Sequence, residues 1–136
     1  MKTTLKLSLL IFISVLSLNC NNSQSTKSKA QQGAIIKLSP KEFKEKSQSQ
    51  TIIDIRTPQE FAQGHIEGAV NINYFDRSFL EQVSKFDKNK PIFIYCRSGS
   101  RTSSASKKMI NQGFSEVADL QGGIMNWAKN KNKIVK

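Results

Sequence analysis

Residues 91–106 read PIFIYCRSGSRTSSAS, and this stretch joins an apolar strand to a helix through a cysteine. The run PIFIYC (91–96) lacks the polar alternation of a half-exposed strand, so it predicts a strand that is covered on both faces. The residues over 100–112 predict a helix, which ends at Gly113. The thiol of Cys96 is therefore expected between the two elements, at the carboxyl end of the strand.

Short apolar runs alternate with helical segments along the rest of the domain. The boxes SPKE (39–42) and TPQE (57–60) each predict a helix start, with the hydroxyl residue as N-cap and the proline at the first helical position. Strands that alternate with helices predict a mainly parallel sheet covered on both faces, and ligands bind at the carboxyl ends of its strands. The expected strands are AIIKL (34–38), TIIDI (51–55), AVNI (69–72), PIFIYC (91–96), which is the most apolar and so should be central, and EVADL (116–120); further helical patterns cover 77–86 and 122–130.

The segment CRSGSR (96–101) has the residue types of an anion-binding loop. The first N–H groups of a helix have no partner within it, and the helix dipole adds positive potential there. Gly99 can take the positive φ of a tight loop, and Arg97 and Arg101 add fixed charge with forked donors. The same surroundings favour the thiolate of Cys96, which is its nucleophilic form. Two interpretations of Ser98 and Ser100 stay open: they donate hydroxyl hydrogen bonds to the substrate, or they are only small loop residues.

Three blocks of the sequence together resemble the rhodanese family of sulfurtransferases: IDIRTPQEFAQGHIEGAVNI (53–72), CRSGSRTSSA (96–105) and LQGGIMNW (120–127). The resemblance covers residues 35–128 and is that of the single-domain form. It implies an α/β fold with a five-stranded, mainly parallel sheet flanked by helices. It also implies a sulfur relay without a metal or organic cofactor. The thiolate attacks the outer sulfur of thiosulfate, sulfite leaves, and cyanide or a thiol then removes the sulfur from a persulfide on Cys96.

The resemblance implies a role for each residue of the loop. Cys96 is the nucleophile and sulfur carrier, and the backbone N–H groups over 97–101 cradle the persulfide. Arg97 is expected to face the entrance and attract the anion. Arg101 is expected to brace the loop and to hold sulfite oxygens.

Four residues upstream look functional, but we expect them to support the structure. Asp54 and Arg56 match the family's Asp-x-Arg pair, and we expect Arg56 to pair with Glu60 while Asp54 fixes neighbouring loop backbone. His65 is the only histidine in the chain. It lies in a family turn motif, GHIEGA, and is expected to order backbone rather than to act as a base for the thiol.

Four large side chains lie near the expected site in the sequence. Met125 and Trp127 are expected to pack the last helix against the domain. Tyr74 and Phe75 follow the third expected strand, and the sequence leaves open whether they line the mouth of the site.

The first 33 residues predict targeting and a tether. Two lysines precede the apolar run 7–18, which suits a signal-peptide core and falls short of the ~20 residues that span a bilayer. Cys20 follows directly, as in bacterial lipoprotein signals, in which the cysteine is acylated. The sequence thus predicts a signal peptide over 1–19, a lipid on Cys20 with a polar tether over 20–33, and a membrane-anchored protein facing the periplasm or cell envelope. A plain secreted protein and an uncleaved anchor are the alternatives.

The domain is expected over 34–128, followed over 129–136 by a basic tail that solvates the chain end. The formal net charge is +11, but much of the excess lies in lysines near the two ends. No DNA- or RNA-binding motif accompanies this charge, so we expect small anions rather than nucleic acid as partners. Nothing in the sequence indicates oligomerisation, and we expect a monomer.

Three other functions fit parts of the pattern. The same fold could serve as a persulfide carrier or sulfur-binding module for a protein partner. A phosphatase or arsenate reductase could use the same thiolate, but the phosphatase loop has one residue more between its cysteine and arginine than lies between Cys96 and Arg101. A non-enzymatic scaffold would be expected to lack the nucleophile, and Cys96 is present.

Overall fold

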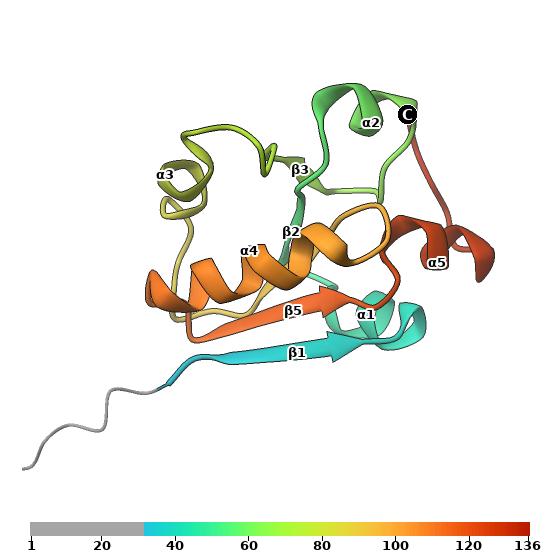
Figure 1. Cartoon of the computed structure of the whole chain (residues 1–136). Helices are drawn as coiled ribbons and strands as arrows, with labels where there is room; N and C mark the ends of the chain where they lie inside the picture. The colour runs from blue at the N-terminus through green and yellow to red at the C-terminus, as the bar shows by residue number, and fades with distance from the viewer. Residues whose placement is uncertain (1–31) are drawn as a thin grey trace, which may run out of the picture.

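The computed structural model of the chain describes residues 32–136. The predicted signal peptide, Cys20 and most of the predicted tether lie outside these residues. Strands and helices alternate along the described chain, as Figure 1 shows. The elements are β1 (Ala34–Leu38), α1 (Pro40–Lys46), β2 (Thr51–Asp54), α2 (Pro58–Gln63), β3 (Val70–Asn71), α3 (Phe79–Val83), β4 (Ile92–Tyr95), α4 (Ser100–Asn111), β5 (Glu116–Leu120) and α5 (Gly123–Lys129).

The local signals that predicted helix starts act as expected in α1 and α2. Ser39 and Thr57 are the N-caps, and each accepts a hydrogen bond from the backbone N–H of the glutamate three residues on. Each glutamate side chain in turn accepts from the N-cap backbone, so both capping boxes are complete. Helix α3 is shorter than its pattern, because the Asp76 side chain accepts from the Ser78 N–H in a turn that precedes the helix.

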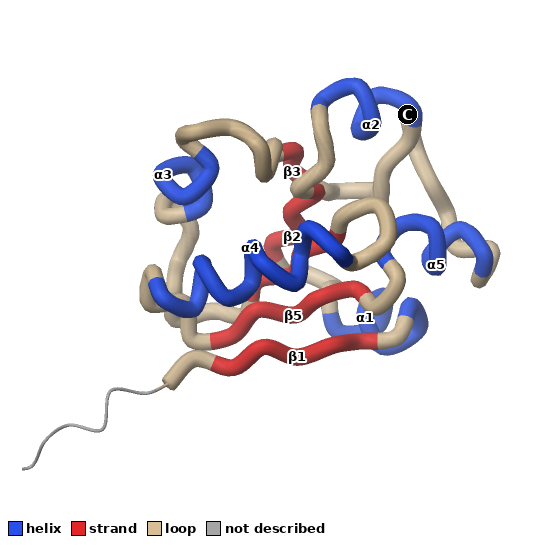
Figure 2. The backbone as a smooth tube through the Cα atoms, viewed as in Figure 1, coloured by secondary structure: helices blue, strands red, loops and turns tan. Residues whose placement is uncertain are grey.

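All five strands pair in parallel, in the order β1-β5-β4-β2-β3. The prediction of a central, fully covered β4 is confirmed, since every residue of Ile92–Tyr95 is buried. Figure 2 shows the strands side by side, with the loop from β4 to α4 emerging at the same end of the sheet as α2 and α5. Parallel pairing thus brings the carboxyl ends of β2, β4 and β5 to one edge of the sheet, and the sequence blocks 53–72, 96–105 and 120–127 meet there.

Two hydrophobic cores lie on opposite faces of the sheet. One packs α3 and α4 against alternate residues of β2, β4 and β5, including Ile94 and Val117. The other packs α1 and α5 against the intervening residues, including Tyr95 and Ala118. Because successive strand residues point to opposite faces, the sheet is the middle layer of three. Cys96 belongs to the core on the α4 side.

The last eight residues contact the domain at several points, although their lysines are exposed as their charge predicts. Val135 forms an antiparallel bridge with His65, and the Trp127 indole N–H donates to the Lys133 carbonyl at 2.9 Å. Lys133 also forms an ion pair with Glu67 at 3.0 Å. The carboxyl end of the chain therefore lies beside α2 (Figure 1). Composition alone could not show this, because each contact joins the segment to a residue that only the fold brings near, or to a backbone group.

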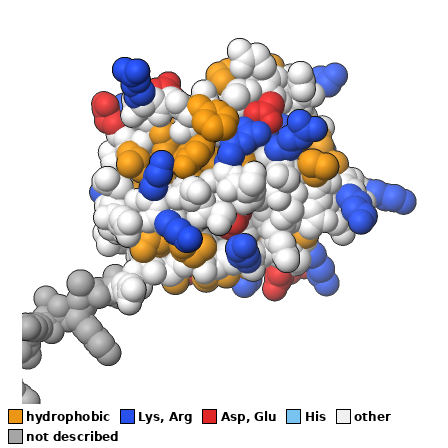
Figure 3. Space-filling view, viewed as in Figure 1, with side chains coloured by type: hydrophobic (Ala, Val, Ile, Leu, Met, Phe, Trp, Pro, Cys, Tyr) orange, Lys and Arg blue, Asp and Glu red, His pale blue; other side chains and the backbone are white. Residues whose placement is uncertain are grey.

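Lys and Arg side chains are spread over the face shown in Figure 3 rather than gathered into one patch. Within residues 32–136, no helix has both the length and the apolar character needed to cross a membrane.

Candidate active site

Cys96 directly follows β4, and its thiol lies inside the loop that leads to α4. The residue is fully buried. The Gly99 N–H donates to the Cys96 Sγ at 3.1 Å, and Gly99 itself has φ of 98° as the N-cap of α4. A residue with a Cβ avoids this left-handed conformation, so glycine lets the chain fold back over the sulfur. The Thr102 Oγ1 lies 3.9 Å from the sulfur on the helix side.

Helix α5 holds the other side of this loop through its backbone. The Ile124 N–H donates to the Cys96 carbonyl at 2.9 Å, and the Met125 N–H donates to the Arg97 carbonyl at 3.2 Å. A Cβ on Gly123 would lie 2.5 Å from each of these two carbonyl oxygens. The first N–H groups of α5 thus fix the strand end that carries the cysteine. Sequence reasoning assigned no such role to this segment, although two glycines at a helix start are a signal of close backbone approach.

Arg101 is held by a carboxylate from another element. Its two terminal nitrogens donate to Glu60 at 2.7 and 2.8 Å, in a bidentate pair that links α4 to α2. The hydrogen bond from Arg101 lowers the pKa of Glu60 to about 2, with help from the Thr57 backbone. Donation to the Glu60 carboxylate likewise raises the pKa of Arg101. The expectation that Arg101 braces the loop agrees with this geometry; its contact with sulfite oxygens stays a prediction.

The expected pairing of Arg56 with Glu60 is wrong. Arg56 instead binds Asp54, two residues earlier, with Nε at 3.0 Å from both carboxylate oxygens and one terminal nitrogen at 2.6 Å. The same nitrogen donates to the Gly64 carbonyl at 2.7 Å. Glu60 is not available, because Arg101 and its own capping box use its oxygens. The expectation for Asp54 agrees with the structure, since it accepts from the Arg56 backbone N–H at 2.9 Å.

Several residues around the loop are open to solvent. Arg97, Ser98 and Ser100 are exposed, and Arg97 has no ion pair within the described part of the chain. Phe75 is 66% exposed, and the Arg101 guanidinium lies 5.5 Å from its ring centroid. Phe75 therefore flanks the loop. Arg97 is the cation best placed to meet an incoming anion.

Three further expectations concern packing near the site. Trp127 is buried, as predicted. The sequence predicts burial for Met125 as well, but it is 55% exposed. It follows Gly123 and Ile124, the two residues of α5 that are buried at the start of the helix. Tyr74 is half-buried against Phe79, with ring centroids 5.3 Å apart, so it supports the core more than the rim of the loop.

His65 takes part in a turn and in packing. Its ring stacks on Phe61 with centroids 3.8 Å apart, and Nδ1 lies 3.2 Å from the Phe61 carbonyl oxygen. Its backbone pairs with Val135. No hydrogen bond joins His65 to Cys96 in the structure, so the geometry supports a backbone-ordering role over a base.

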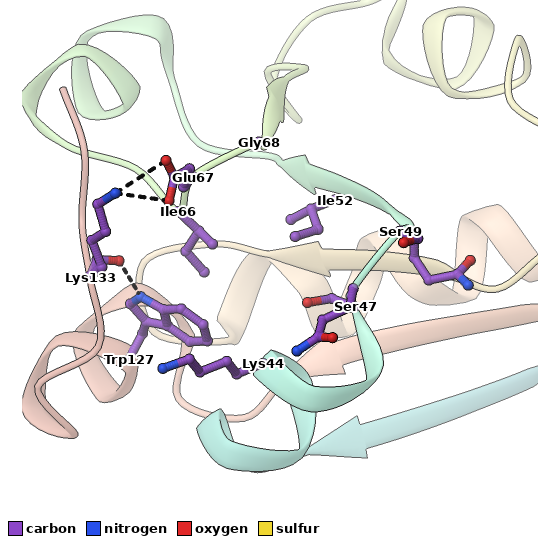
Figure 4. A pocket seen from close by; sticks show the side chains of 11 residues that line it. Lys44, Ser47, Ser49, Ile52, Ile66, Glu67, Gly68, Trp127 and Lys133 are labelled. Carbon is purple, nitrogen blue, oxygen red and sulfur yellow. Dashed lines mark hydrogen bonds and ion pairs between the residues drawn. The ribbon is translucent and has the colours of Figure 1, made fainter.

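A pocket of about 480 Å³ lies elsewhere on the molecule. Figure 4 shows it on the α1 and α5 side, between Lys44, Ile52 and Trp127, with the Lys133–Glu67 ion pair at its rim. None of residues 96–101 lines it. Among residues 32–136, no cluster of three or more His, Cys, Asp or Glu side chains could hold a metal ion. The cysteine loop is therefore the candidate active site on chemical grounds rather than by cavity size.

Comparisons with known proteins agree with this geometry. The model of the rhodanese-like domain matches residues 39–130. The chain belongs to the rhodanese family. It is 42% identical over 88 residues to thiosulfate sulfurtransferase 16, chloroplastic, of Arabidopsis thaliana, a match that covers 57% of this chain and 73% of the relative. It is 35% identical over 92 residues to thiosulfate sulfurtransferase GlpE of Ectopseudomonas mendocina, covering 67% and 83% of the two chains.

A solved structure shows the same fold for this rhodanese domain. The rhodanese-related protein of Thermoplasma volcanium superposes with a TM-score of 0.66 at 23% identity, covering 74% of this chain and 97% of that one. The predicted α/β fold, with a five-stranded parallel sheet flanked by helices, is confirmed.

The ion pair between Glu60 and Arg101 predicts an acid-sensitive element in this rhodanese domain. The folded pKa of Glu60, about 2, lies below its ordinary value of 4.5. The pair therefore adds stability above about pH 4.5, and this is lost as the pH falls toward about 2. Glu60→Gln should lower the free energy of unfolding by about 1–2 kcal/mol at neutral pH and flatten its decline on acidification.

Urea unfolding at neutral and acidic pH measures this effect. Glu67→Gln is the matched control, because its ion pair with Lys133 is exposed, with side chains 67% and 69% accessible, and should change little. A Glu60→Gln variant that is as stable as the parent at neutral pH would refute the bracing role of the pair.

Proposed function

We propose that this protein is a sulfurtransferase that moves a sulfane sulfur through a persulfide on Cys96, from thiosulfate or a similar donor to cyanide or a thiol acceptor. The observation that carries the proposal is the hydrogen bond of 3.1 Å from the Gly99 N–H to the Cys96 Sγ, at the N-terminus of α4. A backbone donor and a helix dipole at this point stabilise a negative sulfur. The names of the two relatives, both thiosulfate sulfurtransferases, support the same class of reaction.

The chemistry of the proposed cycle balances without a redox partner. The Cys96 thiolate attacks the outer sulfur of thiosulfate, the S–S bond of the donor breaks, and sulfite leaves with the electron pair of that bond. A thiolate or cyanide then attacks the outer persulfide sulfur, and the Cys96 thiolate leaves with the electron pair. Two displacements in place of one give ping-pong kinetics.

Burial of the thiol narrows the class of donor. Cys96 is enclosed by its loop, whereas Arg97 beside it is exposed. A donor that presents one terminal sulfur atom, with its negative oxygens directed toward Arg97, fits this arrangement. A phosphate ester would need its oxygens wrapped by the loop, which is one residue shorter than the loop of protein phosphatases.

Kinetics with thiosulfate and cyanide, combined with mass spectrometry, test the proposal. Steady turnover with a transient gain of one sulfur atom at Cys96 is the expected result. One sulfur atom per chain without turnover would identify a persulfide carrier that serves a protein partner. Hydrolysis of 4-nitrophenyl phosphate without sulfur transfer would overturn the proposal in favour of a phosphatase.

We also infer from the sequence that Cys20 carries a lipid and anchors the domain, as a monomer, to a membrane facing the periplasm or cell envelope. The support is the apolar run 7–18 that ends just before this cysteine. Labelled palmitate should be incorporated by the parent chain and not by Cys20→Ala. Equal incorporation by both chains would exclude the anchor.

A further inference from the structure

A buried carboxylate lies on the same side of the sheet as the candidate nucleophile. Asp119 on β5 is 2% exposed, and its neighbours along the strand, Ala118 and Leu120, face the opposite core. Its Oδ1 and the Oγ of Ser106 on α4 are the only two buried side-chain oxygen or nitrogen atoms without a hydrogen-bond partner in residues 32–136. A buried, unpaired carboxylate oxygen is costly, and such groups often serve function.

Sheet register and α4 connect Asp119 to the cysteine. Asp119 pairs with Ile94, and Cys96 lies two residues further along β4 on the same face. Thr102 lies one helical turn before Ser106, on the buried face of α4. Its Oγ1 lies 3.9 Å from the Cys96 Sγ and donates to the Gly99 carbonyl at 3.0 Å. Burial raises the pKa of Asp119, while the nearby Thr102 hydroxyl and the charge of Lys37 oppose this rise.

A threonine hydroxyl has a single proton, so Thr102 can donate to only one acceptor at a time. If its proton goes to the Gly99 carbonyl or the sulfur, the loop and a negative sulfur are stabilised. If that hydroxyl instead donates to an ionised Asp119, the loop and the sulfur both lose a donor. The elements packed around Asp119 carry Lys37 on β1, Cys96 just after β4, and Thr102 and Ser106 on the buried face of α4, and of these Lys37 and Thr102 act on its ionisation.

We propose that Asp119 is a positioning residue that controls the ionisation of Cys96 by setting the direction of the Thr102 hydroxyl. The biological meaning of this inference rests on the proposed function, but the titration that tests it does not require sulfur transfer. Protonated Asp119 leaves the Thr102 donor to the loop and the sulfur. Ionised Asp119 withdraws that donor and opposes the thiolate.

The test follows the ultraviolet absorbance of the thiolate during a pH titration of the full chain. The Cys96→Ser chain is subtracted, which removes the contributions of Cys20 and the tyrosines. Asp119→Asn keeps the shape of the side chain but removes its charge. We expect the midpoint of the thiolate signal to move down by about one pH unit, because the Thr102 donor then stays with the loop and the sulfur and favours the charged form of the thiol.

Three variants make the result specific. Asp87→Asn, an exposed carboxylate beside Lys90, should leave the midpoint unchanged. Thr102→Val should remove most of the effect of Asp119→Asn, because it removes the hydroxyl that links the two groups. Thr102→Ser keeps the hydroxyl and should restore that effect.

Two outcomes would overturn the inference: superimposable curves for the parent and Asp119→Asn, or a shift that persists in full on the Thr102→Val background. If Asp119→Asn fails to fold, Asp119→Ser removes the same charge with a smaller side chain: it should lower the midpoint in the parent chain but not on the Thr102→Val background, and an unchanged midpoint in the parent chain would refute the linkage. The readout does not need turnover. A chain that shows the shift but transfers no sulfur would refute the proposed function alone.

Discussion

Cys96→Ser is expected to lower thiosulfate–cyanide turnover by about 10³-fold or more. A serine hydroxyl at this position stays protonated at neutral pH and cannot form a persulfide, so the first displacement has no nucleophile. The substitution is nearly isosteric, and the Gly99 N–H can still donate to the new oxygen. The fold should therefore persist, and the loss should appear in kcat rather than in stability. Steady-state kinetics with thermal unfolding of the same preparation separate the two.

Cys20→Ser is the matched control for this experiment, because it replaces the other of the two cysteines in the chain without touching the loop. It should retain full turnover and full sulfur loading. Turnover by Cys96→Ser above a few per cent of the parent, or a sulfur atom gained at Cys20, would contradict the assignment of the nucleophile.

The parts of the site that sequence could predict are those encoded by neighbouring residues. The apolar run before Cys96, the proline and glutamate of each capping box, and the glycine in the loop act within a few residues. Each therefore predicts its own local structure. The parallel sheet then follows from the alternation of elements, and it places Cys96 at the sheet edge where ligands bind. This is why the central place of β4 and the position of the loop at the end of that strand agree with expectation.

The contacts that sequence reasoning missed join residues that lie far apart in the chain. Arg101 and Glu60 are 41 residues apart, and a sequence offers Glu60 a nearer cation in Arg56. The preference for Asp54 depends on the direction of the side chains at the end of β2, which residue types do not encode. The same holds for the backbone bridge between Val135 and His65, and for the position of Asp119 on the face of the sheet that carries Cys96. Such pairings are set by packing after the elements form.

Gly123→Ala is expected to destabilise the domain strongly. The new Cβ would lie 2.5 Å from the carbonyl oxygens of Cys96 and Arg97, and the residue has φ of 60°. Both obstacles are backbone atoms that belong to the end of β4, so neither can move without displacing the nucleophile. The free energy of unfolding should fall by about 3 kcal/mol or more, which combines overpacking with a strained backbone.

Gly68→Ala isolates the contribution of the contact from that of the backbone conformation. Gly68 has φ of 81°, but nothing lies within 4 Å of a Cβ built there, so only the left-handed strain of about 1 kcal/mol should appear. Denaturant unfolding of both variants gives the difference between them. In Gly123→Ala that still folds, sulfur transfer should fall further than stability explains, because the Ile124 N–H no longer holds the Cys96 carbonyl at its present distance. Equal losses of stability in the two variants would show that α5 does not fix the end of β4.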